Sequence, residues 1–181
     1  MTPDEAHELY LREIAVLEAE GQSANATRDA NNLFFGYPYD DYIAALRAVR
    51  DEVEERAYLA IVAATEGVLQ QDFRARTRMK ARVPLSKTAR TLLRNREKDG
   101  RRVELEDILD AWAREVLGLK AVIGEFKQLM THRHWLAHGR YFVDKCGVPT
   151  GPDFAYARAC TLLDQLRNVD PAFPLRLPSM T

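Results

Sequence analysis

The sequence predicts an all-α protein, and three observations support that fold class. Apolar residues recur at intervals of three and four along most of the 181-residue chain, a spacing that places them on one face of a helix. Proline, glycine and capping residues stand where these periodic stretches begin and end. Strand signals are nearly absent, and the best of them covers only residues 141–143. We therefore expect a helical bundle.

The first predicted helix starts at Thr2 and extends to about Glu20. Thr2 and Glu5 form a capping-box pattern, and Pro3 occupies the first helical position. Residues 21–38 are predicted to be a loop, after which Asp40 can cap a long second helix. The predicted apolar stripe of that helix comprises Ile43, Leu46, Val49, Val53, Ala57, Ala60, Ile61, Ala64 and Val68.

The second half of the chain repeats these signals. Pro84 breaks the preceding stripe, Ser86 can cap a third helix, and Gly100 can end it. Further helices are predicted over residues 105–117, 119–138 and 152–169. Prolines at positions 171, 174 and 178 then predict an extended tail. We expect one domain, residues 1–170, followed by a proline-containing tail, residues 171–181.

The composition is that of a folded protein without a membrane span. Hydrophobic residues make up 46% of the chain and charged residues 29%, so a disordered chain is excluded. The longest apolar run, residues 57–64, is too short to cross a bilayer. The N-terminus lacks the pattern of a signal peptide, and Cys146 and Cys160 form no metal or disulfide motif. A cytoplasmic location is expected.

Charge is unevenly distributed along the chain, although the net charge is only -1. Residues 74–102 carry twelve basic side chains and two acidic ones, whereas residues 1–60 carry five basic and thirteen acidic ones. Dense positive charge attracts a polyanion and displaces its counterions, so the basic segment can be a phosphate-binding surface. Alternatively, it solvates a helix or pairs with the acidic segment of this chain or of a second copy.

Three of the four histidines lie in one short stretch, THRHWLAHGRYF, residues 131–142. His134 and His138 are four residues apart, which places both rings on one face of a helix and would suit zinc. The zinc-peptidase motif, however, needs a glutamate where Trp135 stands, and a third ligand would have to be Cys146, His7 or an unidentified carboxylate. We therefore predict no metal site.

The helix phase makes this stretch unusual. An apolar stripe that passes through Phe126 and Met130 brings Arg133 and His134 to positions where core residues are due. A cation there is costly unless it is paired or lines a cleft. The alternative is that Arg133 reaches solvent and His138 caps the last turn, where its positive charge would favour the helix dipole.

The stretch Arg133-His134-Trp135-Leu136-Ala137-His138 resembles the R-x4-6-H motif of the HEPN superfamily, the higher eukaryotes and prokaryotes nucleotide-binding domains. A polar residue follows the arginine directly, and a small residue, the histidine and a glycine end the motif. GRRVELEDILDAW, residues 100–112, is also similar to bacterial members of the group. Many members of this superfamily are metal-independent endoribonucleases.

The resemblance implies a HEPN-like bundle that forms a homodimer, with two motifs facing each other across a cleft. It implies cleavage of RNA by attack of the 2′-hydroxyl on the adjacent phosphate, with no metal or cofactor. His138 would accept the proton, Arg133 would stabilise charge on the phosphorane, and His134 would orient the arginine or contact substrate. A toxin–antitoxin or phage-defence setting with a neutralising antitoxin is also implied. The alternative is a non-catalytic HEPN-like module that binds nucleotide, RNA or a protein.

The ribonuclease hypothesis gives further residues a role. The basic segment becomes an RNA track, with the candidate residues Arg74, Arg76, Arg78, Lys80, Arg82, Arg90 and Arg94. Some HEPN toxins carry a modified tyrosine two residues after the motif histidine. In this chain Tyr141 lies three residues after His138, so we expect it to contact substrate or to be a packing residue instead. His132 is expected at the surface. The aromatic cluster Phe34, Phe35, Tyr37, Tyr39 and Tyr42 is expected to pack a bundle end or a dimer contact, with stacking on RNA bases as the alternative.

Overall fold

The computed structural model describes residues 1–22, 27–28, 32, 34–78, 85–138, 147 and 149–175. In these residues the chain is helical and contains no strand, which confirms the predicted all-α class. The predicted strand signal at residues 141–143 lies outside them. The helices are α1 (Pro3–Gly21), α2 (Tyr39–Arg78), α3 (Ser86–Lys98), α4 (Leu105–Glu115), the 3-10 helix η1 (Leu117–Leu119), α5 (Lys120–Ala137) and α6 (Pro152–Val169). Within the described ranges, each helix is too short or too polar to span a bilayer.

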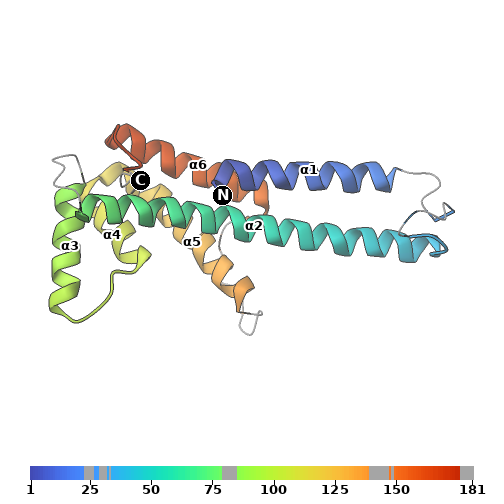
Figure 1. The fold of residues 1–181 in the computed structure, drawn as a ribbon, viewed down its shortest axis with the longest axis horizontal. Coiled ribbons are helices and arrows are strands. Elements are labelled where there is room, and N and C mark those ends of the chain that lie inside the picture. The colour runs from blue at the N-terminus through green and yellow to red at the C-terminus, as the bar shows by residue number, and fades with distance from the viewer. Residues whose placement is uncertain are drawn as a thin grey trace, which may run out of the picture.

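Helix α2 organises the molecule (Figure 1). Its 40 residues give a length of about 60 Å at 1.5 Å per residue. Helix α1 packs antiparallel along the N-terminal half of α2, and together they form a two-helix arm. Helices α3, α4, α5 and α6 gather around the C-terminal half. The last turns of α5 project from this bundle (Figure 1), and His134 and His138 at this end are exposed.

The main hydrophobic core lies in the bundle, where α2 has neighbours on several sides. Its fully buried members include Ile61, Leu69, Leu109, Trp112, Phe126 and Leu162. Each such side chain contributes about 1.5–3 kcal/mol through removal of apolar surface from water. The arm has two smaller clusters, one of which is formed by Tyr10, Ile14, Val53 and Ala57. The bundle therefore provides the rigid base from which α5 projects.

Several predicted helix boundaries are confirmed. The Thr2 hydroxyl accepts a hydrogen bond from the Glu5 N–H at 3.2 Å, and the Glu5 carboxylate accepts one from the Thr2 N–H at 2.7 Å. Gly100 follows the end of α3 at a φ of 66°, a conformation that glycine adopts without steric cost. The prediction that Ser86 caps α3 is wrong. Ser86 is the first helical residue, and the cap position is occupied by Leu85, whose φ is 65°.

The predicted apolar stripe of α2 is only partly correct. Leu46, Val53 and Ile61 are buried as predicted, but Val49 is 39% exposed. Tyr58 is among the residues that are buried outside the predicted stripe. The cause is the packing: α2 contacts α1 along its first half and four other helices along its second half. A single stripe cannot describe a helix whose buried side broadens along its length.

Arg76 is the largest departure from the sequence-based prediction. It was expected on an RNA track, but its side chain is completely buried. Its guanidinium donates to Asp72 and to Asp170, each at 2.5 Å, and so ties the last turns of α2 to the residue after α6. Burial alone would lower the pKa of Arg76, but the two carboxylates outweigh burial and raise it. Arg76 is therefore a structural residue.

The segment after α6 packs onto the bundle in its first residues. Phe173 is buried, with its ring centroid 6.4 Å from that of Trp112. The Leu175 N–H donates to the Asp72 carboxylate at 2.8 Å. Within residues 171–175, which belong to the predicted extended tail, Phe173 thus contributes to the core. Residues 176–181 lie outside the described residues.

Candidate active site at the end of α5

The three neighbouring histidines of α5 have different environments. His132 is 7% exposed, whereas His134 and His138 are exposed. The His132 ring lies edge-on to Tyr58, with centroids 5.0 Å apart, and stacks on Trp135 at 5.3 Å. The prediction that His132 lies at the surface is therefore wrong. The buried side of α5 runs through Phe126, Leu129 and His132, and not through Met130 and His134.

Arg133 faces the long helix. Its Nη1 atom lies 3.5 Å from Oε2 of Glu66 on α2, and the two side chains are 35% and 15% exposed. Burial raises the pKa of the Glu66 carboxyl, and the positive charge of Arg133 opposes that rise. The sequence indicated that a cation at this position needs a partner. The structure identifies that partner as Glu66.

His134 and His138 form an exposed imidazole pair. Their ring centroids are 4.1 Å apart and their planes meet at 53°. His138 is the C-cap residue of α5, and its backbone N–H donates to the His134 carbonyl at 3.1 Å. Imidazole can accept and donate a proton near neutral pH, so the pair can support proton transfer at the helix end.

Arg133 and His138 do not point the same way. They are five residues apart, which corresponds to about 140° around a helix with 3.6 residues per turn. Arg133 accordingly lies toward α2, while His138 lies beside His134 on the exposed side. The fold thus brings Arg133 to Glu66 and His138 to His134. In a single chain, the helix does not place the arginine and His138 on one face.

The described part of the chain contains no set of side chains that could bind a metal ion. No three His, Cys, Asp or Glu side chains come close enough there to hold a metal ion. Cys146, considered as a third ligand, and Tyr141, considered as a substrate contact, both lie outside the described residues.

No protein-family model, curated protein or solved structure matches this chain.

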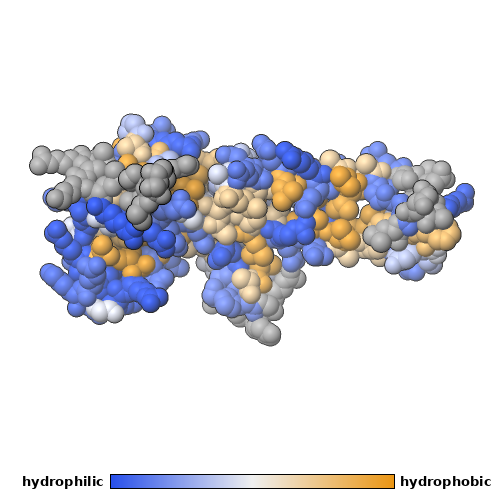
Figure 2. All heavy atoms as spheres, viewed as in Figure 1, coloured by the Kyte–Doolittle hydropathy of each residue, from blue (hydrophilic) through white to orange (hydrophobic). Residues whose placement is uncertain are grey.

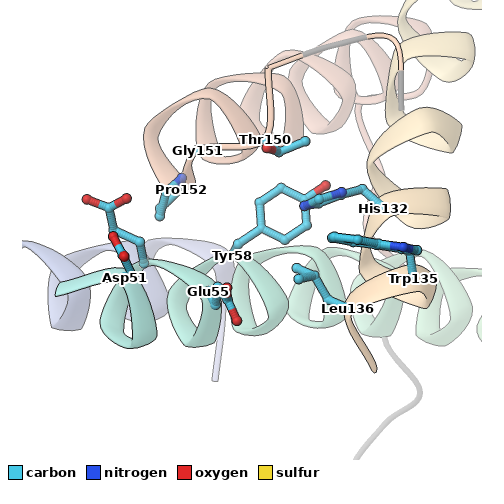
Figure 3. Close-up of a pocket in the computed structure, with 10 residues that line it drawn as sticks. Asp51, Glu55, Tyr58, His132, Trp135, Leu136, Thr150, Gly151 and Pro152 are labelled. Atoms are coloured by element: carbon cyan, nitrogen blue, oxygen red, sulfur yellow. The ribbon is translucent and has the colours of Figure 1, made fainter. Parts of the chain in front are cut away.

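A pocket of about 490 Å³ lies on one side of this helix end, between α2, α5 and the start of α6 (Figure 3). Tyr58, His132 and Trp135 form an aromatic wall, and Tyr58 donates its hydroxyl to the Leu129 carbonyl at 2.9 Å. The remaining lining side chains include three acids: Asp51, Glu54 and Glu55. Glu54 forms an ion pair with Arg50, whose Nε lies 2.9 Å from Oε1 of Glu54. The size suits a small ligand, but the carboxylates disfavour a phosphate.

The predicted RNA-track residues are dispersed. Arg74 and Arg78 are exposed on the last turns of α2, whereas Arg94 is exposed and Arg90 is half-buried on α3. Arg76 is excluded by its burial, and Lys80 and Arg82 lie outside the described residues. The described candidates that remain thus lie on two helices, α2 and α3, which pack against each other.

The aromatic cluster occupies the far end of the arm. Phe34 and Tyr42 are buried, with centroids 5.1 Å apart, and the Tyr42 hydroxyl donates to the Glu20 carbonyl. Phe35, Tyr37 and Tyr39 are exposed around them. The buried pair closes the end of the α1–α2 arm, as expected. This end is distant from the tip of α5 (Figure 1).

Glu66 is the site residue that sequence reasoning missed. It lies on α2 between Thr65 and Gly67, in an otherwise uncharged stretch that runs from Ala57 to Leu69. A lone carboxylate in such a run must find a cation or remain unpaired, because burial of an isolated charge is costly. The cost of an unpaired charge thus indicates that Glu66, like Arg133, needs a partner of opposite charge, and the packing of α5 on α2 brings the two together.

Proposed function

We propose that this protein is a metal-independent endoribonuclease that acts as a homodimer. The observation that carries the proposal is the accessible His134–His138 pair in the same two turns of α5 as Arg133, whose guanidinium is held by Glu66. These residue types supply the acid–base group and the fixed cation that RNA cleavage requires. The motif's resemblance to HEPN ribonucleases supports the same reaction.

In the proposed reaction His138 removes the proton from a ribose 2′-hydroxyl. The 2′-oxygen then forms a bond to the adjacent phosphorus, and the bond from phosphorus to the 5′-oxygen of the next nucleotide breaks. The leaving 5′-oxygen takes up a proton from water, and His138 releases the proton it accepted to solvent, so the products end in a 2′,3′-cyclic phosphate and a 5′-hydroxyl. Arg133 stabilises the additional negative charge that develops on the phosphorane oxygens. His134 shares the proton with His138 or contacts the substrate.

The proposed dimer resolves the divergence of Arg133 and His138. Because the two side chains point about 140° apart on one helix, we propose that Arg133 of one copy acts with His138 of the other. The projecting end of α5 and the partial exposure of Arg133 leave both groups accessible to a second copy. A cytoplasmic toxin–antitoxin or phage-defence role, with a neutralising partner, belongs to this proposal through the motif resemblance.

The second candidate is a non-catalytic module that binds a nucleotide, RNA or a protein in the same region. The observation that favours it is again the divergence of Arg133 and His138, since a single chain does not assemble the catalytic pair. The two functions differ in whether RNA is cut.

The test is incubation of labelled RNA with the purified protein in EDTA, alongside Arg133→Ala and His138→Ala. Arg47→Ala, an exposed arginine on the arm, serves as the matched control. We expect cleavage by the wild type and by the control, loss of at least a hundredfold in rate in the two site variants, and 2′,3′-cyclic phosphate ends. Binding without cleavage would establish the module instead. Equal cleavage by all four proteins would reveal a contaminating nuclease.

A further inference from the structure

Two adjoining hollows lie on the side of the bundle formed by α3, α4, η1 and α5. One of about 380 Å³ lies between α3 and α4, and one of about 790 Å³ extends from them to α5. Leu92 and Arg114 line both, so the two hollows form one continuous depression. We refer to it as the α3–α5 groove.

The groove has an excess of unpaired positive charge. Two of its three acids already have basic partners: Asp107 pairs with Arg96, and Asp110 pairs with Lys127 at 2.7 Å. Three further cations line the groove without an ion pair to any described residue: Lys87, Arg114 and Lys120. Only Glu115 among the acids that line the groove opposes them. The groove therefore favours an anionic ligand, in contrast to the acidic pocket beside Trp135.

Part of the α5 side of the groove lies on the same helix face as the exposed histidines. Lys120, Ile123, Gly124 and Lys127 line it from α5. Beyond Lys120, Gly124 and Lys127, steps of four, three and four residues reach Thr131, His134 and His138, so these six residues share one helix face. From Lys120 to His138 the distance along the axis is about 27 Å at 1.5 Å per residue. One face of α5 thus connects a cationic depression to the imidazole pair.

The groove also offers apolar surface. Leu92, Ala113 and Leu117 line its larger part together with the buried Ile123, and Leu117 is 85% exposed. Figure 2 shows hydrophobic residues ringed by hydrophilic ones over α3 and α4. A single RNA strand presents both a phosphate backbone and unstacked bases, so cations beside apolar surface match it better than they match an inorganic anion.

We propose that the α3–α5 groove binds a single RNA strand and directs it along α5 to His134 and His138. Lys87, Arg114 and Lys120 contact phosphates, and the apolar wall contacts bases. The inference rests on the proposed ribonuclease function and adds the location of the substrate strand. It differs from the track predicted from the sequence: Lys87 belongs to the basic segment, but Arg114 and Lys120 come from α4 and α5 and lie outside it.

The binding test uses a labelled 12-nucleotide RNA whose riboses are 2′-O-methylated, which cannot be cleaved by 2′-hydroxyl attack. The variant Arg114→Gln/Lys120→Gln removes two groove cations, and Arg47→Gln removes one exposed cation on the arm as a control. We expect the double variant to bind at least tenfold more weakly at 0.1 M salt. The slope of log affinity against log salt should fall by about 1.4, or about 0.7 for each lost phosphate contact on a single strand. The proposal would be overturned if the double variant bound this RNA as tightly as the wild type does, or if the wild type showed no detectable binding.

A second measurement separates the groove from the ribonuclease. A dinucleotide is too short to reach from His138 to Lys120, so the double variant should cleave it at the wild-type rate while cleaving a 20-nucleotide RNA more slowly. Loss of binding in a protein that cuts no RNA would retain the groove and reject the nuclease. Equal cleavage of long and short RNA by the variant and the wild type would retain the nuclease and reject the groove.

Discussion

Arg133 on α5 forms an ion pair with Glu66 on α2, at 3.5 Å between Nη1 and Oε2. This pair compensates a cation on the side of α5 that faces the long helix. It also fixes the direction of the arginine relative to His138, which lies with His134 on the exposed side. The pair therefore determines which groups a single chain can bring together and which groups require a second chain.

Glu66→Gln should change how stability depends on pH. Burial raises the pKa of Glu66 above its ordinary value of 4.5, so the folded protein binds a proton more readily there than the unfolded chain does. The stability that Glu66 contributes is then present below about pH 4.5 and falls as pH rises through the raised pKa. Urea unfolding of the wild type and of Glu66→Gln between pH 4 and 8 measures it. The difference in unfolding free energy, wild type minus variant, should decrease with pH; parallel profiles would contradict the burial of Glu66.

His132→Ala and His134→Ala should differ strongly in stability. His132 is buried between Tyr58 and Trp135, so its truncation leaves a cavity and should cost about 2–4 kcal/mol. His134 is exposed, and its truncation should change stability by less than about 0.5 kcal/mol. Chemical denaturation of both variants provides the comparison. Equal losses of stability would contradict the orientation of α5 in which His132 is buried and His134 is exposed.

The helices could be predicted from the sequence because their signals are local. Thr2 and Glu5 are three residues apart and interact within one turn, and Gly100 adopts a conformation that few other residues tolerate. The rotation of each helix was harder to predict. Val49 and His132 were assigned to the wrong side because several apolar phases fit a helix that packs on more than one neighbour.

The candidate site could be predicted only in part, for a related reason. The Arg133-to-His138 stretch was identified by its residue types and spacing, and the need for a partner of Arg133 followed from the cost of an unpaired charge. The identity of that partner depends on which helices lie side by side. The same holds for Arg76 and Asp170, which are 94 residues apart, and for the groove, whose cations come from three helices.

Arg76→Met should destabilise the protein without a direct effect on RNA contacts. The substitution leaves Asp72 and Asp170 buried without their cation, and loss of one partner from a buried ion pair costs about 3–5 kcal/mol. Arg78→Met, two residues further along the helix and exposed, is the matched control and should change stability by less than about 0.5 kcal/mol. Thermal and urea unfolding measure both. Similar small effects would return Arg76 to the surface role predicted from the sequence.

Mixing two inactive variants should restore ribonuclease activity. If Arg133 of one copy acts with His138 of the other, a heterodimer of Arg133→Ala and His138→Ala contains one intact combination, in which the second variant supplies the arginine and the first supplies the histidine. Random exchange makes half of the dimers mixed, each with one active site of two, so about a quarter of wild-type activity is expected.

The measurement is RNA cleavage after the two variants have been mixed under conditions that allow subunit exchange. Each variant mixed with itself is the control for residual activity. A mixture of Arg133→Ala with the double variant Arg133→Ala/His138→Ala is the control for exchange, because neither chain carries the arginine. Recovery in the first mixture alone would establish a site shared between chains. Wild-type activity in a monomer, or no recovery despite demonstrated exchange, would mean that Arg133 and His138 act within one chain.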